Sequence, residues 1–258
     1  MDVPCVVLVP SGTGTSKLAQ VAAHNVDVFA VEGTFSDCFE LAQTVAEDDR
    51  VVNATAVYSA NSFAPAANRG VAFELAASLG NAPDWVSVPV GAGPLLGGTY
   101  QGFRELRDAG LIERTPRMLC VQARGCHPIV RAIERDEPVR AWEGQIETNI
   151  GAIADPLRGY PSDGERTKQA VLDSGGTAIS LSDDTVEAWH DWLAAEAGVY
   201  AEPASAASVA AAVECDAVDE DETVVALITG HGLKEPAGVS VAPDAVPSVT
   251  TLRSALVD

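Results

Sequence analysis

The sequence predicts an α/β protein built on parallel sheets, and three observations support that class. Short apolar runs rich in valine alternate with amphipathic segments along most of the 258 residues. The runs are almost continuously apolar, as in strands that helices cover on both faces. Glycine-containing turns lie between several runs and the helices that follow them. Right-handed crossovers are expected to join the strands.

The first elements expected are a strand at 5–9, a helix at 16–24, a strand at 26–31, a helix at 35–47 and a strand at 51–57. Asn61 and Ser62 follow the last of these strands. Ligands of open α/β sheets bind beyond the carboxyl ends of strands, so these two residues are candidates for a binding loop. The alternative for 58–70 is a proline-containing loop closed by Asx turns.

The alternation continues through the rest of the chain. The expected helices are 66–79, 95–108, 128–135, 164–174, one capped by Ser182 that ends near 196, and 204–215. The expected strands are 85–90, 118–123, 177–181 and 223–228. Residues 142–162 are expected to be irregular, and the proline-containing tail from Pro236 to be a surface extension.

The most informative stretch is VSVPVGAGPLLGGTYQGF, residues 86–103. An apolar strand leads into Gly91, Ala92 and Gly93, and a helix follows. Backbone N–H groups in such a turn can converge on a phosphate, and the helix dipole favours its negative charge. The alternative is that these glycines only form the turn between strand and helix of an α/β unit and bind no ligand.

Two other turns also contain candidate polar groups. SGTGTSK, residues 11–17, lacks the glycine before and the hydroxyl after the lysine that a P-loop requires, so its polar residues are interpreted as turn and capping residues. Thr229 ends an apolar run and precedes Gly230. A hydroxyl there can bond a ring nitrogen of a bound heterocycle, although threonine is also a common turn residue. His231 is interpreted as structural.

Composition limits the classes of partner that the chain is expected to bind. The chain has 37 acidic against 16 basic residues and a net charge of -21, which argues against nucleic acid or an anionic membrane as a partner. The few lysines suggest adaptation to high salt. The five cysteines show no metal or disulfide spacing, so reduced thiols, no metal site and a cytoplasmic location are expected. No leader or apolar span suggests a membrane protein.

Taken together, six segments resemble the threonine synthase branch of the pyridoxal 5'-phosphate (PLP) enzymes of the tryptophan synthase β type, also called fold type II. They follow the family's order over nearly the whole chain. These segments are 17–42, 58–74, 88–103, VQARGCHPIVRAI at 121–133, GVYAEPASAASVAA at 198–211 and VVALITGHGLKEP at 224–236.

The resemblance implies a fold and a cofactor. Residues 1–52 would be the remainder of a small mobile domain, 53–235 a large PLP-binding domain and 236–258 an extension. The cofactor phosphate would be bound by Gly91, Ala92, Gly93, Pro94 and Leu95. Thr229 would face the pyridine nitrogen, where a hydroxyl leaves the ring less protonated than a carboxylate would. Asn61 and Ser62 would belong to the pocket for an amino-acid substrate.

The sequence departs from the family in its two binding loops. The family has a second asparagine and a phosphate-gripping arginine where Ala64 and Ala67 stand, and Arg69 lies two residues further on. Loss of that charge-assisted contact argues against a phosphorylated substrate. The family's phosphate loop also has asparagines where Ala92 and Pro94 stand.

The family's Schiff-base lysine lies before the strand at 5–9, whereas Lys17, Lys168 and Lys234 match non-catalytic positions. PLP chemistry needs that amine. The expected function is therefore a threonine synthase-like lyase, converting O-phosphohomoserine to threonine and phosphate, that is incomplete as this chain alone. A homodimer or a separately encoded N-terminal segment is the expected partner. The alternatives are a related lyase, such as a threonine or serine dehydratase or a β-replacement enzyme, and a non-catalytic amino-acid-binding or partner subunit.

Overall fold

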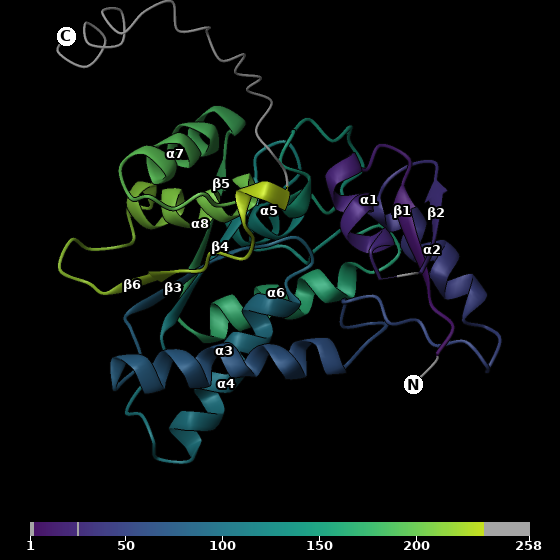
Figure 1. The fold of residues 1–258 in the computed structure, drawn as a ribbon. Coiled ribbons are helices and arrows are strands. Elements are labelled where there is room, and N and C mark those ends of the chain that lie inside the picture. The colour runs from purple at the N-terminus through teal and green to yellow at the C-terminus, as the bar shows by residue number, and fades with distance from the viewer. Residues whose placement is uncertain (1–2, 25, 235–258) are drawn as a thin grey trace, which may run out of the picture.

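The computed structural model describes residues 3–24 and 26–234, which contain two parallel sheets (Figure 1). The first sheet pairs β1 (Val6–Pro10) with β2 (Asp27–Val31). The second has the order β5-β4-β3-β6. Its strands are β3 (Trp85–Pro89), β4 (Arg117–Ala123), β5 (Thr177–Leu181) and β6 (Val224–Ala226). All of these pairs are parallel, which confirms the predicted fold class.

The helices lie close to their predicted positions. They are α1 (Thr15–Ala22), α2 (Phe35–Val45), α3 (Phe63–Leu79), α4 (Pro94–Asp108), α5 (Pro128–Glu134), α6 (Pro161–Asp173), α7 (Asp183–Ala195) and α8 (Pro203–Glu214). The short 3-10 turns η1 (Gly151–Ile153) and η2 (Gly232–Lys234) complete the set that the structure describes. Several helices begin with proline, whose missing N–H costs nothing at that position. Ser182 caps α7 as predicted by accepting a hydrogen bond from the Thr185 N–H.

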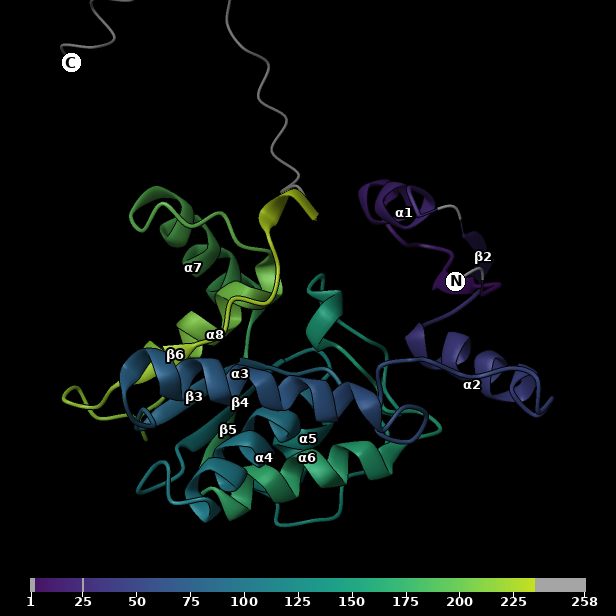
Figure 2. The same cartoon turned by 60° about the horizontal axis from the view of Figure 1, so that its bottom comes forward.

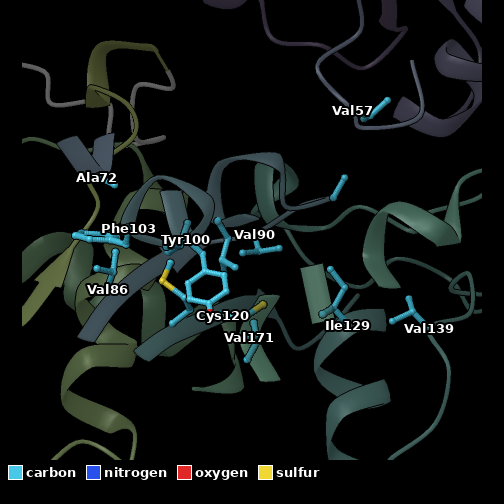
Figure 3. Close-up of a cluster of buried hydrophobic side chains, with 14 of the residues drawn as sticks. Val57, Ala72, Val86, Val90, Tyr100, Phe103, Cys120, Ile129, Val139 and Val171 are labelled. Atoms are coloured by element: carbon cyan, nitrogen blue, oxygen red, sulfur yellow. The ribbon is translucent and has the colours of Figure 1, made fainter. Parts of the chain in front are cut away.

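Alternate residues of the central strands face two separate cores. Val86 and Val88 belong to the core beneath α4 and α6, whereas Trp85 belongs to the core beneath α7 and α8. Figure 3 shows part of the first core, and Figure 1 shows the two helix layers on either side of the sheet. Both faces of β3 are therefore covered, which explains why its sequence is continuously apolar.

The predicted strand at 51–57 is wrong, because the structure has an irregular segment there. The Oδ1 of Asn53 accepts hydrogen bonds from the N–H and the hydroxyl of Thr55, at 3.0 and 2.6 Å. Such local bonds to backbone compete with a strand ladder. Val57 is buried, but Val52 is 84% exposed. The segment connects the N-terminal elements to the large sheet instead of adding a strand to either.

The N-terminal elements lie to one side of the large sheet (Figure 2). Helix α2 contacts the rest of the protein through Tyr160, whose ring lies 4.6 Å from that of Phe39 in an edge-to-face arrangement. The hydroxyls of Ser36 and Tyr160 are 3.4 Å apart. None of the described helices combines the length and the apolar character that crossing a bilayer requires. The predicted extension at 236–258 lies outside the described residues.

Candidate functional site

The glycine turn and Thr229 lie at the same edge of the large sheet. Strand β3 is followed by Gly91, and its parallel neighbour β6 is followed by the segment that ends at Thr229. The Leu227 N–H bonds the Ser87 carbonyl at 3.0 Å and extends the pairing toward this edge. Carboxyl ends of parallel strands are the usual ligand-binding edge of such sheets. The fold therefore brings together two of the predicted binding segments, although Gly93 and Thr229 are 136 positions apart in the chain.

Side chains from other parts of the chain donate hydrogen bonds to the backbone carbonyls of the glycine turn, residues 91–93. The donors are Gln122 Nε2 to Gly91 (3.3 Å), Thr167 Oγ1 to Ala92 (2.8 Å) and the Tyr58 hydroxyl to Gly93 (3.4 Å). The N–H groups of Ala92 and Gly93 have no acceptor in the part of the chain that the structure describes. The turn therefore leaves backbone donors available for an anion.

Helix α4 begins directly after the turn, with Pro94 as its first residue and Gly93 as its cap. The N–H groups of Leu95 and Leu96 lie in the first turn of this helix, where no helix carbonyl precedes them. Gly93 has φ of 96°, and a Cβ there would lie 2.2 Å from Thr167 Oγ1. The close approach of α6 thus requires glycine at this position. Together these groups form a candidate anion site of the kind that helix N-termini provide.

Gln122 is a buried polar residue that the sequence interpretation missed. Its Oε1 accepts hydrogen bonds from the N–H groups of Ile129 and Val130, at 2.9 and 3.2 Å. Its Nε2 reaches the Gly91 carbonyl. The residue connects β4, the start of α5 and the glycine turn. A polar side chain inside an otherwise apolar strand was the signal that could have identified it.

Two carboxyl groups lie near the turn, the buried Asp163 and the half-buried Asp155, and both were also missed. The Oδ1 of Asp155 accepts hydrogen bonds from the Leu157 N–H at 2.9 Å and the Tyr160 hydroxyl at 2.7 Å. Burial raises the pKa of Asp155 above its ordinary value. Asp163 accepts from the Ser59 N–H at 3.2 Å. Burial also raises the pKa of Tyr58 to about 12, so its hydroxyl stays protonated as the donor to the turn.

Thr229 is held by two residues at the start of α8. Its Oγ1 donates to the carboxylate of Glu202 at 3.1 Å and lies 3.0 Å from the hydroxyl of Ser205. Thr229 itself is exposed, so its hydroxyl is accessible at the sheet edge. Glu202 and Ser205 fall in the quoted EPAS segment, but the sequence alone gave no reason to connect them with a threonine more than 20 residues later.

Asn61 and Ser62 do not join this cluster. The Oδ1 of Asn61 accepts from the Phe63 N–H at 3.0 Å, which matches the Asx-turn alternative. Its Nδ2 donates to the Ala54 carbonyl at 3.2 Å. Ser62 is exposed at the start of α3. No hydrogen bond joins either residue to the glycine turn or to Thr229 within the described ranges.

The basic residues singled out in the sequence have other partners. Lys168 donates to the carbonyl of Glu137, on the α5 side of α6. Lys234 donates to Glu202 at 3.0 Å and so borders the Thr229 cluster. Lys17 lies in α1. Arg69 bonds Glu105 at 2.8 Å, beside a cavity of about 540 Å³ that lies between α3, α4 and α6.

Comparison with known proteins identifies the family. Residues 1–230 match the family described as pyridoxal-phosphate dependent enzymes. The chain is 36% identical over 243 residues to the threonine synthase of Methanosarcina acetivorans, covering 91% of this chain and 58% of that relative. It is 33% identical over 238 residues to that of Methanocaldococcus jannaschii, covering 90% of this chain and 57% of the relative. The chain thus spans less than two thirds of the length of these relatives.

A solved structure confirms the fold. Maize serine racemase superposes with a TM-score of 0.70 at 15% sequence identity, covering 98% of this chain and 69% of that one. The mixed α/β architecture with parallel sheets is that of fold type II PLP enzymes, as the sequence predicted. The match over residues 1–230 and the identity to curated relatives lead to one conclusion: the chain belongs to the family of pyridoxal-phosphate dependent enzymes.

Proposed function

We propose that this chain forms the cofactor-binding part of a threonine synthase-like lyase, which converts O-phosphohomoserine to threonine and inorganic phosphate. One observation carries the proposal: the carbonyls of the turn 91–93 accept hydrogen bonds from side chains and its N–H groups are available, at the same sheet edge as Thr229, which follows the neighbouring strand β6. Residues 1–52 would belong to the small domain and 53–235 to the large, cofactor-binding domain.

Each end of PLP has matching groups at the sheet edge. Gly91, Ala92, Gly93, Pro94 and Leu95 would surround the phosphate, with N–H donors from every residue except the proline. The first turn of α4 adds its dipole to the attraction. Thr229 would bond the ring nitrogen. When bound, PLP supplies an electron sink for carbanion chemistry at the substrate carbons. The fold's part is to fix the phosphate and the ring so that the substrate meets one face of the cofactor.

The substrate side of the proposal rests on Asn61 and Ser62. Both lie at the start of α3, in the loop that follows the connecting segment. The side-chain amide of Asn61 is hydrogen-bonded to backbone groups of Ala54 and Phe63. Ser62 makes no side-chain capping bond, so the Ser62 hydroxyl is available for a ligand. We propose that this loop contributes polar contacts to the amino-acid substrate.

We further propose that activity requires an N-terminal segment that supplies the Schiff-base lysine. The curated relatives are longer than this chain. The two-stranded sheet also has large exposed apolar side chains: Val6 is 55% and Phe29 is 56% exposed. Two-stranded sheets with an uncovered apolar face are marginally stable alone. An added segment that covers this face would both stabilise the small domain and complete the catalytic machinery.

A second candidate is a lyase that acts on an unphosphorylated amino acid. Arg69 is the arginine nearest in sequence to the family's phosphate-gripping position, and it is paired with Glu105 on α4. Ala64 and Ala67 contribute no charge in its place. This observation favours a dehydratase or β-replacement enzyme over threonine synthase on the substrate side, and leaves the cofactor side unchanged.

Reconstitution of activity distinguishes a threonine synthase from a lyase that acts on an unphosphorylated amino acid. The 258-residue chain is mixed with a separately produced N-terminal segment matched to the curated relatives, together with PLP in high salt. Threonine and phosphate formed from O-phosphohomoserine support threonine synthase activity. A keto acid formed only from threonine or serine supports the second candidate. No product from any substrate contradicts both. Intact mass after borohydride reduction tests the lysine: an adduct on this chain would contradict the need for an N-terminal lysine.

A further inference from the structure

We propose that the cavity between α3, α4 and α6 is a second anion site, which binds a small organic phosphate monoester. Its volume of about 540 Å³ is in the range of small-molecule pockets. The described residues that line it include none of the glycine turn and neither Asn61, Ser62 nor Thr229. The cavity is therefore distinct from the proposed cofactor and substrate sites, and the inference does not rest on the function proposed above.

Each of the three helices contributes one arginine to this cavity: Arg69 from α3, Arg104 from α4 and Arg166 from α6. Arg69 is paired with Glu105 at 2.8 Å. The guanidinium groups of Arg104 and Arg166 have neither a carboxylate partner nor a hydrogen bond within residues 3–24 and 26–234. Two positive charges at the cavity are therefore left without a counter-charge from the described protein.

Two carboxylates also line the cavity among the described residues, and both already have donors. Glu105 accepts from its arginine partner on α3 and from the side chain of Gln101, the latter at 3.2 Å. Asp173 accepts from Gln169 Nε2 at 2.6 Å. These local bonds leave the guanidinium groups of Arg104 and Arg166 as the unmatched charges of the cavity.

Tyrosine rings hold these two guanidinium groups at the cavity. The Cζ of Arg104 is 6.0 Å from the centroid of the Tyr100 ring, and the Cζ of Arg166 is 5.7 Å from that of Tyr58. Both distances are compatible with a cation–π contact. Tyr58 is itself fixed, because its hydroxyl donates to the Gly93 carbonyl at 3.4 Å. The guanidinium groups are therefore partly ordered before an anion binds, which lowers the entropy cost of binding.

The chemistry of the lining selects an organic phosphate. A guanidinium group presents its N–H donors in a planar fork that matches the oxygens of a phosphate or a carboxylate. Two unmatched positive charges fit the charge of a phosphate monoester, close to two negative charges near neutral pH, better than the single charge of a carboxylate. Small or apolar residues leave room for an apolar body, namely Pro65, Ala66, Gly97, Gly98 and Ala170.

The charge of the whole chain makes this arginine cluster informative. With 37 acidic against 16 basic residues, the protein as a whole is expected to repel anions. Three arginines against two carboxylates give this one cavity a local excess of positive charge. A dianion bound by Arg104 and Arg166 would also offset the repulsion between the two guanidinium groups.

Amide NMR of the 258-residue chain, titrated with phenyl phosphate at constant ionic strength, tests the site. The signals of Gly97, Gly98, Gln101 and Ala170 should shift together and give one dissociation constant. Signals at these residues that stay unchanged throughout the titration would overturn the inference. Shifts at the glycine turn alone would overturn it as well, but would leave the proposed cofactor site standing.

Two further ligands test the chemical class without any variant. Benzoate has the same ring and a single negative charge, so the chain should bind phenyl phosphate more tightly by roughly tenfold, the size of one charge-assisted hydrogen bond. Equal or tighter binding of benzoate at the cavity would overturn the assignment to a phosphate. Inorganic phosphate lacks the apolar body and should bind more weakly, and equal binding of the two phosphates would overturn the assignment to an organic ester.

Arg104→Gln and Arg166→Gln should each weaken phenyl phosphate binding at the cavity by roughly tenfold. Neither guanidinium makes a hydrogen bond or ion pair in the described part of the chain, so urea unfolding should change little and verifies that the variants fold. Arg107→Gln is the matched control, because Arg107 lies on α4 but is paired with Asp108 and does not line the cavity. No loss in either cavity variant, or an equal loss in the control, would overturn the inference.

Discussion

Thr167 of α6 donates a hydrogen bond of 2.8 Å to the carbonyl of Ala92 in the glycine turn. The same hydroxyl lies 3.1 Å from the Asp163 carbonyl one helical turn earlier. Both contacts are buried. A helix on one face of the sheet thus fixes the conformation of the turn that we propose binds the cofactor phosphate, and the orientation of the N–H groups depends on this contact.

Thr167→Val should weaken both stability and phosphate binding. The substitution keeps the shape of the side chain but leaves the buried Ala92 carbonyl without its donor, at a cost of about 1–3 kcal/mol. Urea unfolding measures the free energy, and calorimetry measures pyridoxamine phosphate binding. Thr44→Val is the matched control, because Thr44 also bonds a helix carbonyl, that of Glu40 at 3.0 Å, but on an exposed helix face. Equal effects of the two substitutions would contradict this role of Thr167.

Gly93→Ala should destabilise the protein far more than Gly110→Ala. Both glycines have positive φ, 96° and 71°, so both substitutions strain the backbone by about 1 kcal/mol. Only at Gly93 would the new Cβ meet a side chain, at 2.2 Å from Thr167 Oγ1, whereas Gly110 has nothing within 4 Å. The difference between the two free energies of unfolding isolates the steric clash. A difference near zero would mean that α6 does not restrict the turn.

The free energy of unfolding of the Asp155→Asn variant should increase relative to that of the native chain as pH rises. Burial raises the folded-state pKa of Asp155, so the folded protein holds the proton more tightly than the unfolded one. The native chain therefore loses stability as pH rises from about 4, the ordinary aspartate pKa, toward the raised value. Asparagine keeps an acceptor for Tyr160 and Leu157 and does not ionise. The measurement is the difference in unfolding free energy at several pH values.

Asp37→Asn provides a control of opposite sign. Hydrogen bonds from the backbone and the side chain of Thr34 lower the pKa of Asp37, which closes a capping box at the start of α2. Its stabilising contribution is present above the ordinary aspartate pKa and is lost as pH falls through the lowered value. Asp37→Asn should therefore lower the free energy of unfolding by a larger amount as pH rises. The same trend at both positions would contradict the assignment of Asp155.

Gln122→Met should destabilise the turn and the start of α5 together. The substitution keeps the length of the side chain but leaves the N–H groups of Ile129 and Val130 without an acceptor. Each buried unpaired group costs about 1–3 kcal/mol. Hydrogen exchange at these amides should accelerate together with that of the Val90 N–H, which bonds the Val121 carbonyl just before the turn. Gln101→Met is the control, because Gln101 is exposed and its side chain donates to Glu105 within the same helix. Accelerated exchange limited to α5 would show that Gln122 does not support the turn.

The sequence was most informative where structure is local. The apolar run before Gly91 predicted a buried strand, and the glycines after it predicted the turn into a helix that the structure has there. The prediction failed at 51–57, where valines suggest a strand but the Asn53 side chain closes a turn. The pattern of apolar residues does not show whether a single side-chain hydrogen bond or the pairing of a whole strand has the more favourable free energy.

The supporting residues could not be predicted, because they are distant in the sequence. Thr167 reaches Ala92 across 75 residues, and Gln122 reaches Gly91 across 31. Ser205 and Glu202 meet Thr229 only because α8 lies against the sheet beside β6. These contacts follow from tertiary packing, for which a single sequence shows no period or spacing.

The most direct test of the cofactor site is amide NMR of the chain titrated with pyridoxamine 5'-phosphate. The account predicts that the N–H signals of Ala92, Gly93 and Leu95 shift downfield together with that of Thr229, with one dissociation constant. The competing anion site is the arginine-containing cavity between α3, α4 and α6, which Arg69 and Arg166 line. Shifts confined to that cavity, or unchanged signals at the glycine turn in the presence of saturating probe, would contradict the account.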